Sequence, residues 1–393
     1  MRILHLSDLH LGKRVNEFSM LEDQRYILER ISEMIEEEKP RAVVIAGDIY
    51  DKPLPPAEAV QLFDSFLSGL EEMELDVFII SGNHDSAERL SFGASIMDKR
   101  GIHFAGGYDG SIHRVILEDE YGEVCFYMLP FLKPSHVRAF IEKEYTDEDE
   151  KPEIDSYTDA VRFAVERMDI DRSKRNVLIA HQFCTGSERS ESEEITVGGI
   201  DNVDASVFED FDYTALGHLH GPQDTTSSGV RYCGSPLKYS FSEADQEKSV
   251  TMIELGAKNN GVCVGNIRTL GLVPLRDLKV IRGPFDQLTS RDYYEQADTD
   301  SYLRVILTDE EDIIGALSDL RAIYPNIMRL EYDNMRTRTF SSVPDAAETD
   351  SRTPLEIFAG LYEKQNGKPM SEDQTALVEG LIDIVWGTDD ETA

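Results

Sequence analysis

The chain has 393 residues and a net charge of −37, from 76 acidic and 39 basic residues. This length allows roughly two or three domains of about 150 residues, and no apolar run approaches the roughly 20 residues of a membrane-spanning helix. The charge excludes a general electrostatic attraction of nucleic acid or anionic lipid. A well-solvated acidic surface is the simplest interpretation. A polyanionic substrate would need bound metals, a local basic patch or a partner to attract it.

The cysteines and the first residues bear on the compartment. The four cysteines, Cys125, Cys184, Cys233 and Cys263, are far apart and form no CxxC pair. The opening residues, MRILHLSDLH, contain an aspartate and two histidines, which is not the pattern of a signal peptide. Together these features predict a cytoplasmic protein with reduced thiols.

Strands and helices are predicted to alternate in the first half of the chain. Two short apolar runs, residues 2–8 and 42–48, each end in an aspartate. Between them, residues 22–40 have the apolar spacing of an amphipathic helix that ends near Pro40. Residues 56–73 predict a second helix. Its apolar side is expected to contain Val60, Phe63, Phe66, Leu67 and Leu70.

Three further apolar runs lead into polar side chains. The run in residues 75–85 is followed by Asn-His-Asp, the run in 176–183 by a histidine, and the run in 212–220 by His-x-His. Strand ends followed by loops are where α/β proteins place their chemistry. The polar segment GSERSESEE, residues 186–194, is expected to be a flexible insertion with no function beyond solvation.

The motifs and composition divide the chain into two predicted domains, a linker and a tail. Residues 1–272 contain all the histidine motifs, and residues 273–335 have a strand–strand–helix–strand pattern without histidine. We interpret the first part as the functional domain and the second as a small α+β accessory domain. Residues 336–352 are rich in Ser, Thr, Asp and Ala and predict a linker. Residues 353–393 form a helical tail.

The tail is predicted to contain two capped helices. Thr353 with Glu356, and Ser371 with Gln374, have the spacing of capping boxes, and Pro354 suits a first helical position. The second helix has an apolar stripe made of Leu377, Val378, Leu381, Ile382, Val385 and Trp386. Such a stripe needs a partner surface. It can pack on the accessory domain or dock on another protein, and the preceding linker favours the second alternative.

The polar groups at the five strand ends form one candidate site. They are Asp8, His10, Asp48, Asp51, Asn83, His84, Asp85, His181, His218 and His220. Carboxylates, imidazoles and an amide without cysteine suit manganese, iron, zinc or similar divalent ions. The set is too large for one tetrahedral ion and fits two ions that share a bridging carboxylate. Two such ions stabilise the attacking and leaving oxygens of a phosphoryl displacement.

The order of these motifs resembles the calcineurin-like metallophosphoesterase superfamily. The matching segments are ILHLSDLHLG, AGDIYDKPLPP, SGNHDS, ALGHLH and YCGSPLKYSFSE. Within the superfamily the whole chain is similar to the nuclease components of DNA repair enzymes built from two kinds of chain. It departs from the phosphoprotein phosphatases, which typically have GDxxDRG and GNHE where this chain has GDIYDKP and GNHDS. The resemblance implies an α/β fold. That fold is a β-sandwich flanked by helices, with a small α+β capping domain and a two-helix tail.

The resemblance also implies a role for each residue. One ion would be held by Asp8, His10, Asp48 and His220, and the other by Asp48, Asn83, His181 and His218. His84 would contact the scissile phosphate and protonate the leaving oxygen, which suits an imidazole near neutral pH. Asp51 and Asp85 are expected to orient neighbouring catalytic groups, although a loop cap is an equal alternative for Asp85.

The activity implied is manganese-dependent hydrolysis of DNA. It would act on duplex ends as an exonuclease, and on single strands or hairpins as an endonuclease. The partner implied is an ABC-type ATPase with a long coiled coil, bound through residues 353–386, and this chain contains no P-loop of its own. Two copies are expected to pair through helices in the first domain, for which residues 22–35 and 57–70 are the candidates.

Two other functions stay open. One is a phosphodiesterase acting on nucleotides or other small phosphodiesters, and the other is a scaffold whose ligand set is vestigial. Lys13, Arg14 and Asn16 are candidates for phosphate contact or for a solvated loop. His5 is expected in the core, and His103, His113 and His136 are interpreted as surface or structural groups.

Overall fold

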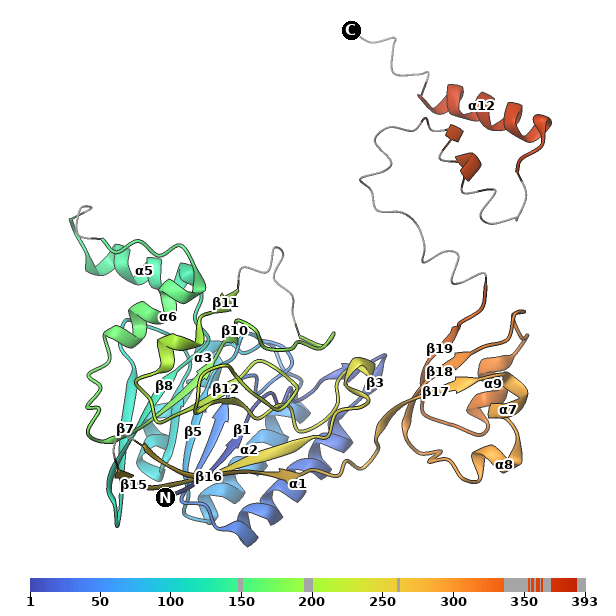
Figure 1. Ribbon diagram of the computed structural model, residues 1–393. Helices are drawn as coiled ribbons and strands as arrows, with labels where there is room; N and C mark the ends of the chain where they lie inside the picture. The colour runs from blue at the N-terminus through green and yellow to red at the C-terminus, as the bar shows by residue number, and fades with distance from the viewer. Residues whose placement is uncertain are drawn as a thin grey trace. The chain divides into compact units, whose positions relative to one another are not determined.

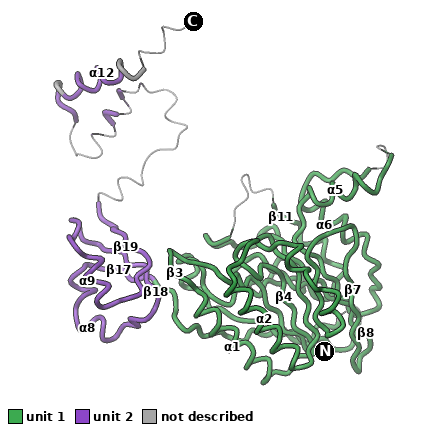
Figure 2. The backbone as a smooth tube through the Cα atoms, turned by 180° about the vertical axis from the view of Figure 1, so that it is seen from behind, with its two compact units in different colours: residues 1–279 green, residues 280–393 purple. Residues whose placement is uncertain are grey.

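The computed structural model describes residues 1–147, 151–193, 201–259 and 262–335, and parts of the C-terminal segment. These parts are residues 353, 355–356, 358–360, 362 and 369–386. The predicted linker, residues 336–352, and Pro354 lie outside the described residues. The chain forms two compact units, residues 1–279 and 280–393 (Figure 2).

The first unit contains two six-stranded mixed sheets. In the first sheet the strand order is β16-β15-β1-β4-β5-β6, and β1, β4, β5 and β6 are parallel. The bounds are β1 Arg2–Leu6, β4 Ala42–Ala46, β5 Asp76–Ile80, β6 Ile102–Ala105, β15 Ser249–Asn259 and β16 Val262–Gly271. The parallel strands are nearly all apolar because both of their faces are buried.

The second sheet has the order β13-β14-β12-β9-β8-β7, with β14, β12, β9 and β8 parallel. Its strands are β7 His113–Asp119, β8 Gly122–Leu129, β9 Arg175–His181, β12 Tyr213–Gly217, β13 Gln223–Asp224 and β14 Val230–Tyr232. Two short ribbons, β2 Arg14–Val15 with β3 Phe18–Ser19 and β10 Phe183–Cys184 with β11 Asn202–Val203, lie outside these sheets.

The two sheets pack face to face around an apolar core. Phe78 of β5 stacks on Phe126 of β8 with ring centroids 4.3 Å apart, and Val44 and Val177 belong to the same buried cluster. A second cluster lies on the outer face of the second sheet, where Val137 and other residues of two helices cover it. These helices are α5 Pro134–Glu144 and α6 Tyr157–Glu166. The sandwich flanked by helices is the fold that the sequence predicts (Figure 1).

Two amphipathic helices occupy the predicted positions beside the first sheet (Figure 1). They are α1 Leu21–Glu38 and α2 Ala57–Glu72. Val60 is exposed, contrary to the expectation that it belongs to the buried side of α2. The buried stripe passes through Ala59, Phe63, Phe66 and Leu70. One residue beyond Ala59 lies about 100° around the helix, which turns Val60 away from the stripe.

Several short helical turns connect the strands of the first unit. They are α3 Ala87–Leu90, α4 Ala94–Met97, η1 Asp98–Arg100, η3 Ala205–Phe208 and η4 Phe241–Glu243. The four cysteines are free and buried, and His5 lies in the core. No helix among the described residues is both long enough and apolar enough to cross a bilayer.

A three-stranded sheet of order β17-β18-β19 begins at the boundary and continues through the second unit, with bounds Leu278–Gly283, Tyr302–Leu307 and Ile327–Tyr332. The helices α7 Phe285–Leu288, α8 Arg291–Tyr294 and α9 Ala316–Arg321 accompany it. Its core includes Val305, Leu320 and Tyr324. This is the strand–strand–helix–strand order expected from the sequence, with two short helices added between the first two strands.

The described part of the tail contains both predicted capping boxes. Thr353 and Glu356 exchange hydrogen bonds between main chain and side chain, and so do Ser371 and Gln374. The second box begins α12, Glu372–Trp386. Leu377 and Leu381 on this helix are 66% and 52% exposed. These two residues of the predicted stripe are therefore accessible, whereas the side chains of Val385 and Trp386 lie outside the described part.

Candidate metal centre

The candidate ligands lie on loops at the carboxyl ends of five parallel strands. Asp8 follows β1, Asp48 follows β4 and Asn83 follows β5, whereas His181 ends β9 and His218 follows β12. Parallel pairing brings these ends to the same edge of the sandwich. Eight described residues other than glycine have positive φ, and four of them are candidate ligands: Asp8, His10, Asp48 and His218. Such strained backbone is concentrated at functional sites.

Three side chains converge on one side of the centre, which we call the His181 side. The Oδ1 atom of Asn83 lies 3.1 Å from Nε2 of His181 and 3.0 Å from Nδ1 of His218. The other ring nitrogen of His181, Nδ1, donates to the main-chain oxygen of Ala46 at 2.8 Å. This contact fixes the tautomer and directs Nε2 to the centre. The ring of Phe131 stacks beside that of His218.

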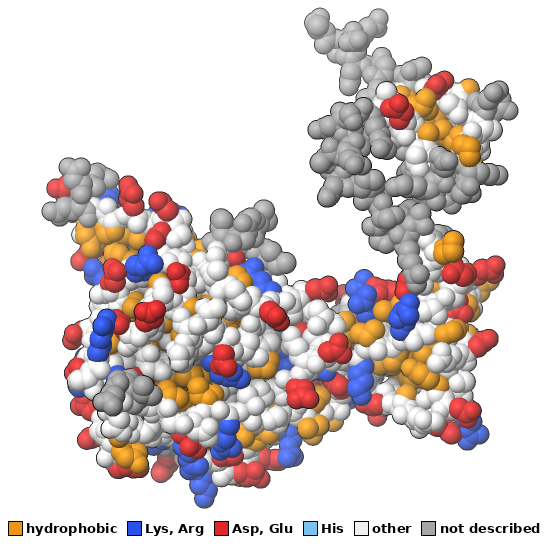
Figure 3. All heavy atoms as spheres, in the orientation of Figure 1, with side chains coloured by type: hydrophobic (Ala, Val, Ile, Leu, Met, Phe, Trp, Pro, Cys, Tyr) orange, Lys and Arg blue, Asp and Glu red, His pale blue; other side chains and the backbone are white. Residues whose placement is uncertain are grey.

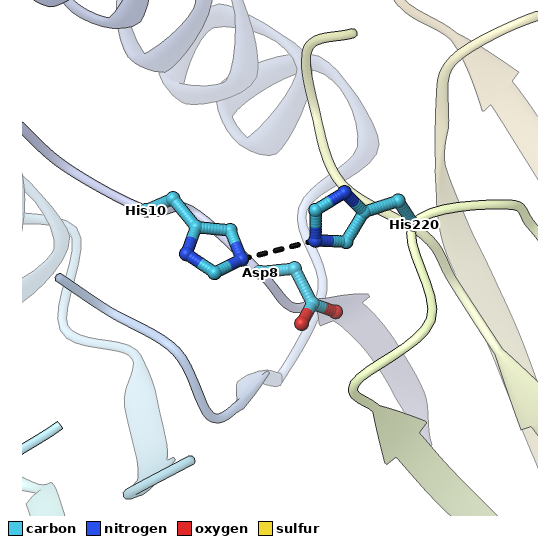
Figure 4. A group of neighbouring side chains, drawn as sticks. All are labelled: Asp8, His10 and His220. Atoms are coloured by element: carbon cyan, nitrogen blue, oxygen red, sulfur yellow. Dashed lines mark hydrogen bonds between the residues drawn. The ribbon is translucent and has the colours of Figure 1, made fainter. Parts of the chain in front are cut away.

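Three other side chains form the His220 side. The Nε2 atoms of His10 and His220 face each other at 3.0 Å, and the carboxylate of Asp8 lies beside them (Figure 4). Asp8 also accepts the main-chain N–H of His218 at 3.0 Å, which ties the two sides together. All three side chains are buried.

Asp48 lies between the two sides. Its Oδ2 atom is 3.3 Å from Nε2 of His181 and 3.7 Å from Nε2 of His10. Its Oδ1 atom accepts the main-chain N–H of His84 at 2.9 Å. One carboxylate oxygen therefore faces an imidazole from each side, which is the position required of a bridging ligand.

The spacing and chemistry of these donors fit divalent metal ions. Neighbouring ligands of an octahedral ion with bonds of about 2.1 Å lie about 3.0 Å apart. The contacts of His10 with His220, and of Asn83 with both His181 and His218, are 3.0–3.1 Å. The donors are all oxygen or nitrogen.

The protonation states of the candidate ligands also favour metal binding. Burial holds the pKa of His10 and of His218 well below the usual value, which leaves neutral imidazoles. Burial opposes ionisation of Asp48, but the imidazoles of His181, His10 and His84 outweigh it and hold the pKa of Asp48 well below its usual range. Burial would lower the pKa of His181, yet Asp48 raises it to about 9. The carboxylate that attracts this proton would equally attract a cation.

His84 stands at the edge of the centre. Its Nδ1 lies 3.0 Å from the main-chain oxygen of Asp51 and must donate to it, so Nε2 faces Asp48 at 4.0 Å. The Asp51 side chain pairs with Lys13 at 2.6 Å and lies 3.9 Å from Nδ1 of His10. The ring of His84 is therefore oriented by main chain, and at 16% exposure its side chain is more accessible than the buried histidine ligands.

The carboxylate of Asp85 is bound by main-chain groups. Its two oxygens accept main-chain N–H groups of Ile49, Tyr50 and Gly82 at 2.9–3.1 Å. These contacts join the loop after β4 to the loop after β5. Of the two alternatives weighed from the sequence, the structure has the geometry of the loop cap.

The sequence analysis missed a buried charged group behind His220. Nδ1 of His220 lies 3.2 Å from Oε1 of Glu243, and Glu243 pairs with Lys248 at 2.5 Å. Burial alone would raise the pKa of Glu243, but His220 and Lys248 lower it to about 2. Glu243 belongs to the YSFSE segment, which the sequence analysis used only as part of the family resemblance. The one local sign of a buried acid was its position after aromatic and hydroxyl residues.

The polar insertion also contributes to the site, which corrects the expectation that it serves solvation alone. Oγ of Ser192 lies 2.8 Å from Nδ1 of His220, and Oε1 of Glu193 accepts the main-chain N–H of His220 at 2.7 Å. Glu193 is buried. The polar composition of the segment gave no sign of these contacts, because their partner, His220, is distant in sequence. Glu194 lies outside the described residues.

The fold and the donor set define a class of protein, and comparison with known sequences agrees. The chain belongs to the calcineurin-like phosphoesterase family, whose sequence model matches residues 1–222. A second model, described as the type 5 capsule protein repressor C-terminal domain, matches residues 274–366.

A curated relative narrows the assignment. The SbcD chain of the nuclease SbcCD from Staphylococcus epidermidis is 32% identical over 392 residues, which cover 98% of this chain and 99% of the relative. The resemblance to nuclease components noted from the motifs is thus confirmed over essentially the whole chain.

Solved structures give weaker similarities. A dimetal phosphatase from Danio rerio is 13% identical, with a TM-score of 0.41 over 70% of this chain and 96% of that chain. Yfce, a phosphoesterase from E. coli, is 15% identical, with a TM-score of 0.27 over 68% of this chain and 98% of that chain.

Proposed function

We propose that this protein is the metal-dependent nuclease component of a DNA repair and recombination enzyme that also contains an ATPase chain. It would hydrolyse phosphodiester bonds at duplex ends and in single strands or hairpins, in the cytoplasm. The observation that carries the proposal is the position of Asp48 between two complete sets of donors. The 32% identity to a nuclease chain, over 98% of this chain, supports a nucleic acid as the substrate over a small phosphodiester.

The proposed centre holds two manganese ions. Asp8, His10, Asp48 and His220 would hold one, and Asp48, Asn83, His181 and His218 the other. When bound, two such ions stabilise the charge that develops on the attacking and leaving oxygens of a phosphoryl displacement. The chain's own contribution is to hold this set rigidly, with His181 and His220 each fixed through the second ring nitrogen.

His84 is the proposed proton donor. With Nδ1 bound to the main-chain oxygen of Asp51, the imidazolium form carries its second proton on Nε2, which faces the centre. From there it can contact the scissile phosphate and protonate the leaving oxygen. Asp51 and Asp85 act indirectly, through the orientation of His84 and of the two loops.

Attraction of DNA requires help, because the chain carries a charge of −37. On the face seen in Figure 3, basic side chains are interspersed with acidic ones. Near the centre, Lys13 pairs with Asp51, and Lys133 is exposed beside the ring of Phe131. We propose that an SbcC-type ABC ATPase with a long coiled coil supplies most of the DNA affinity.

The tail is the proposed binding segment for this partner. Gln374 of α12 hydrogen-bonds the hydroxyl of Tyr362 at 3.0 Å, which links the two tail helices and leaves Leu377 and Leu381 accessible. An exposed apolar stripe suits helix-to-helix docking. Leu377→Asp with Leu381→Asp should abolish co-purification with the ATPase, whereas Glu379→Gln on the same helix should not. Retained binding in the double aspartate variant would place the interface elsewhere.

We also propose a homodimer within the assembly. Val60 on α2, Leu54 before it, and Phe92 and Ile96 in the segment after β5 are exposed apolar side chains. A dimer would explain why Val60 faces outward. Light scattering of Phe92→Asp should give a monomer where the wild-type chain gives a dimer; a monomeric wild-type chain would contradict this part of the proposal.

The decisive experiment is cleavage of a labelled DNA hairpin with manganese, with and without the ATPase partner and ATP. Wild type is compared with His84→Gln, with His136→Gln as a histidine control outside the site. We expect His84→Gln to keep its metal content and lose cleavage, and His136→Gln to behave as wild type. If wild type binds metal and cleaves bis(p-nitrophenyl) phosphate but never DNA, the small-phosphodiester alternative replaces the proposal.

A further inference from the structure

A second group of metal-binding side chains lies outside the phosphoesterase centre. Asp98 begins the short helix η1, His103 lies on β6 and His113 lies on β7. One ligand atom from each lies within 4.8 Å of the others. The strands β6 and β7 are edge strands of different sheets. The group therefore spans one edge of the sandwich, and the nuclease proposal makes no use of it.

His103 is the buried member of the group, with 7% exposure. Its Nδ1 lies 2.6 Å from Oδ1 of Asp98, and its ring stacks on Phe78 with centroids 5.0 Å apart. Its Nε2 has no hydrogen-bond partner among the described residues and lies 3.8 Å from Oδ1 of Asp76. The ring thus directs one nitrogen to the group and the other to a carboxylate, which is how metal-binding histidines are usually held.

The other two ligands are accessible. The side chains of Asp98 and His113 are 47% and 39% exposed, and Nε2 of His113 lies 3.9 Å from Oδ1 of Asp98. Ligands of a tetrahedral ion with bonds of about 2.0–2.1 Å lie about 3.3 Å apart. The observed separations of 2.6 and 3.9 Å bracket that value. Small rotations of the exposed Asp98 and His113 side chains would bring both separations to about 3.3 Å.

We propose that Asp98, His103 and His113 bind one divalent transition-metal ion of the zinc class, with water completing the coordination. Two imidazoles and one carboxylate select zinc, cobalt or nickel over magnesium and calcium. The ion would join the edge strands of the two sheets and fix the base of residues 87–100, which carry the exposed Phe92 and Ile96.

The alternative to a metal ion in this group is a proton on His103. Burial would lower the pKa of His103, but the carboxylates of Asp76 and Asp98 raise it. The other oxygen of Asp76 already pairs with Arg41 at 2.5 Å. A divalent cation would neutralise the remaining negative charge of this group more fully than one proton on His103 can.

The test is zinc stoichiometry of the full-length chain. Wild type, His113→Gln, Asp98→Asn and the control His136→Gln are dialysed against zinc at mildly alkaline pH, and bound zinc per chain is measured by mass spectrometry. The main centre is identical in all four proteins, so any difference reports on this group alone. We expect His113→Gln and Asp98→Asn to bind one zinc ion fewer than wild type and control, with DNA cleavage by His113→Gln unchanged.

A stability measurement supplies the second readout. Zinc should raise the unfolding temperature of wild type more than that of His113→Gln, because an ion that binds only the folded chain stabilises it. His113 is exposed, so its replacement leaves the fold intact. Equal zinc content in wild type and His113→Gln would overturn the proposal and leave a protonated His103 between two carboxylates. Neither result depends on the nuclease assignment.

Discussion

The histidines on the two sides of Asp48 are oriented by different parts of the chain. On the His181 side, Nδ1 of His181 donates to a main-chain oxygen, that of Ala46. On the His220 side, Nδ1 of His220 contacts the side chains of Ser192 and Glu243, and Glu243 in turn pairs with Lys248. One side is held by the backbone of a central strand and the other by replaceable side chains.

This difference determines how each side can be altered. A backbone carbonyl cannot be removed by mutation, so the His181 side is sensitive only at its ligands and at positions where an added atom collides. The His220 side can be adjusted gradually, through three side chains that touch no substrate. Four substitutions test the contrast, in order of decreasing expected effect.

Asp48→Asn should have the largest effect because it removes the charge that both sides share. We expect DNA cleavage with manganese to fall by roughly 10³-fold or more, since an amide is a poor bridge between two cations. The measurement is initial cleavage rate together with bound metal per chain. Asp64→Asn, at an exposed position of α2, is the control. Cleavage within tenfold of wild type would show that Asp48 is not the bridge.

Gly47→Ala should break the His181 side without changing a ligand. A Cβ atom there would lie 2.4 Å from Nδ1 of His181, and the residue has φ of +88°. We expect a loss of cleavage of roughly 10²-fold or more, because displacement of a catalytic group by about 1 Å is that costly. Gly93→Ala is a matched control, since Gly93 has φ of +77° and no atom within 4 Å of the added Cβ.

The two glycine variants separate backbone strain from collision. Both should lose stability from the positive φ, by about 1–2 kcal/mol, measured by urea unfolding. Only Gly47→Ala should lose cleavage. Equal cleavage by the two variants would mean that the contact of His181 with the main chain does not set the activity.

Glu243→Gln should weaken the His220 side gradually. Removal of a carboxylate behind a metal-binding histidine typically reduces metal affinity or activity by about 10–100-fold. High manganese should restore most of the cleavage in this variant and little of it in Asp48→Asn. Glu247→Gln, at an exposed position nearby, is the control. Failure of excess metal to restore Glu243→Gln would contradict a positioning role through His220.

The double variant Glu243→Gln/Lys248→Met distinguishes positioning from stability. Glu243→Gln alone leaves the buried ammonium of Lys248 without its carboxylate, which costs about 3 kcal/mol of unfolding free energy. The double variant removes that ammonium and should recover stability but not metal affinity. Recovery of both would reduce the role of Glu243 to support of the fold.

The sequence predicted the candidate metal ligands of both sides, but not the side chains that orient His220. The ligands follow or end apolar runs, which made Asp8, Asp48 and His181 predictable as groups at strand ends. Asp8 and Asp48 follow strands of the first sheet and His181 ends a strand of the second, so only the packing of the two sheets brings them together. The strand pattern also predicted the accessory sheet, whereas the sandwich was expected from the resemblance. Pairing of ligands with individual ions required the resemblance, and it remains a proposal.

The outer contacts of the His220 side could not be predicted. Ser192 and Glu193 lie in a segment whose composition resembles any solvated loop, and Glu243 reaches His220 only through the folded chain. Burial of the Glu243–Lys248 pair is a tertiary property that local patterns do not encode. Val60 shows the same limit, since its exposure depends on where the stripe of α2 begins.

Asp85→Asn should have the smallest effect because Asp85 bonds only main-chain groups of the loops that carry Asp48 and Asn83, and no ligand side chain. Its two oxygens accept three main-chain N–H groups, and an amide has only one oxygen to offer. At least one buried N–H would lose its partner, at a cost of about 1–3 kcal/mol in unfolding free energy. Urea unfolding should show this loss, with the exposed Asp245→Asn as control, while cleavage falls less than tenfold. A larger loss of cleavage would mean that Asp85 acts on the reacting groups and is more than a cap that joins the two loops.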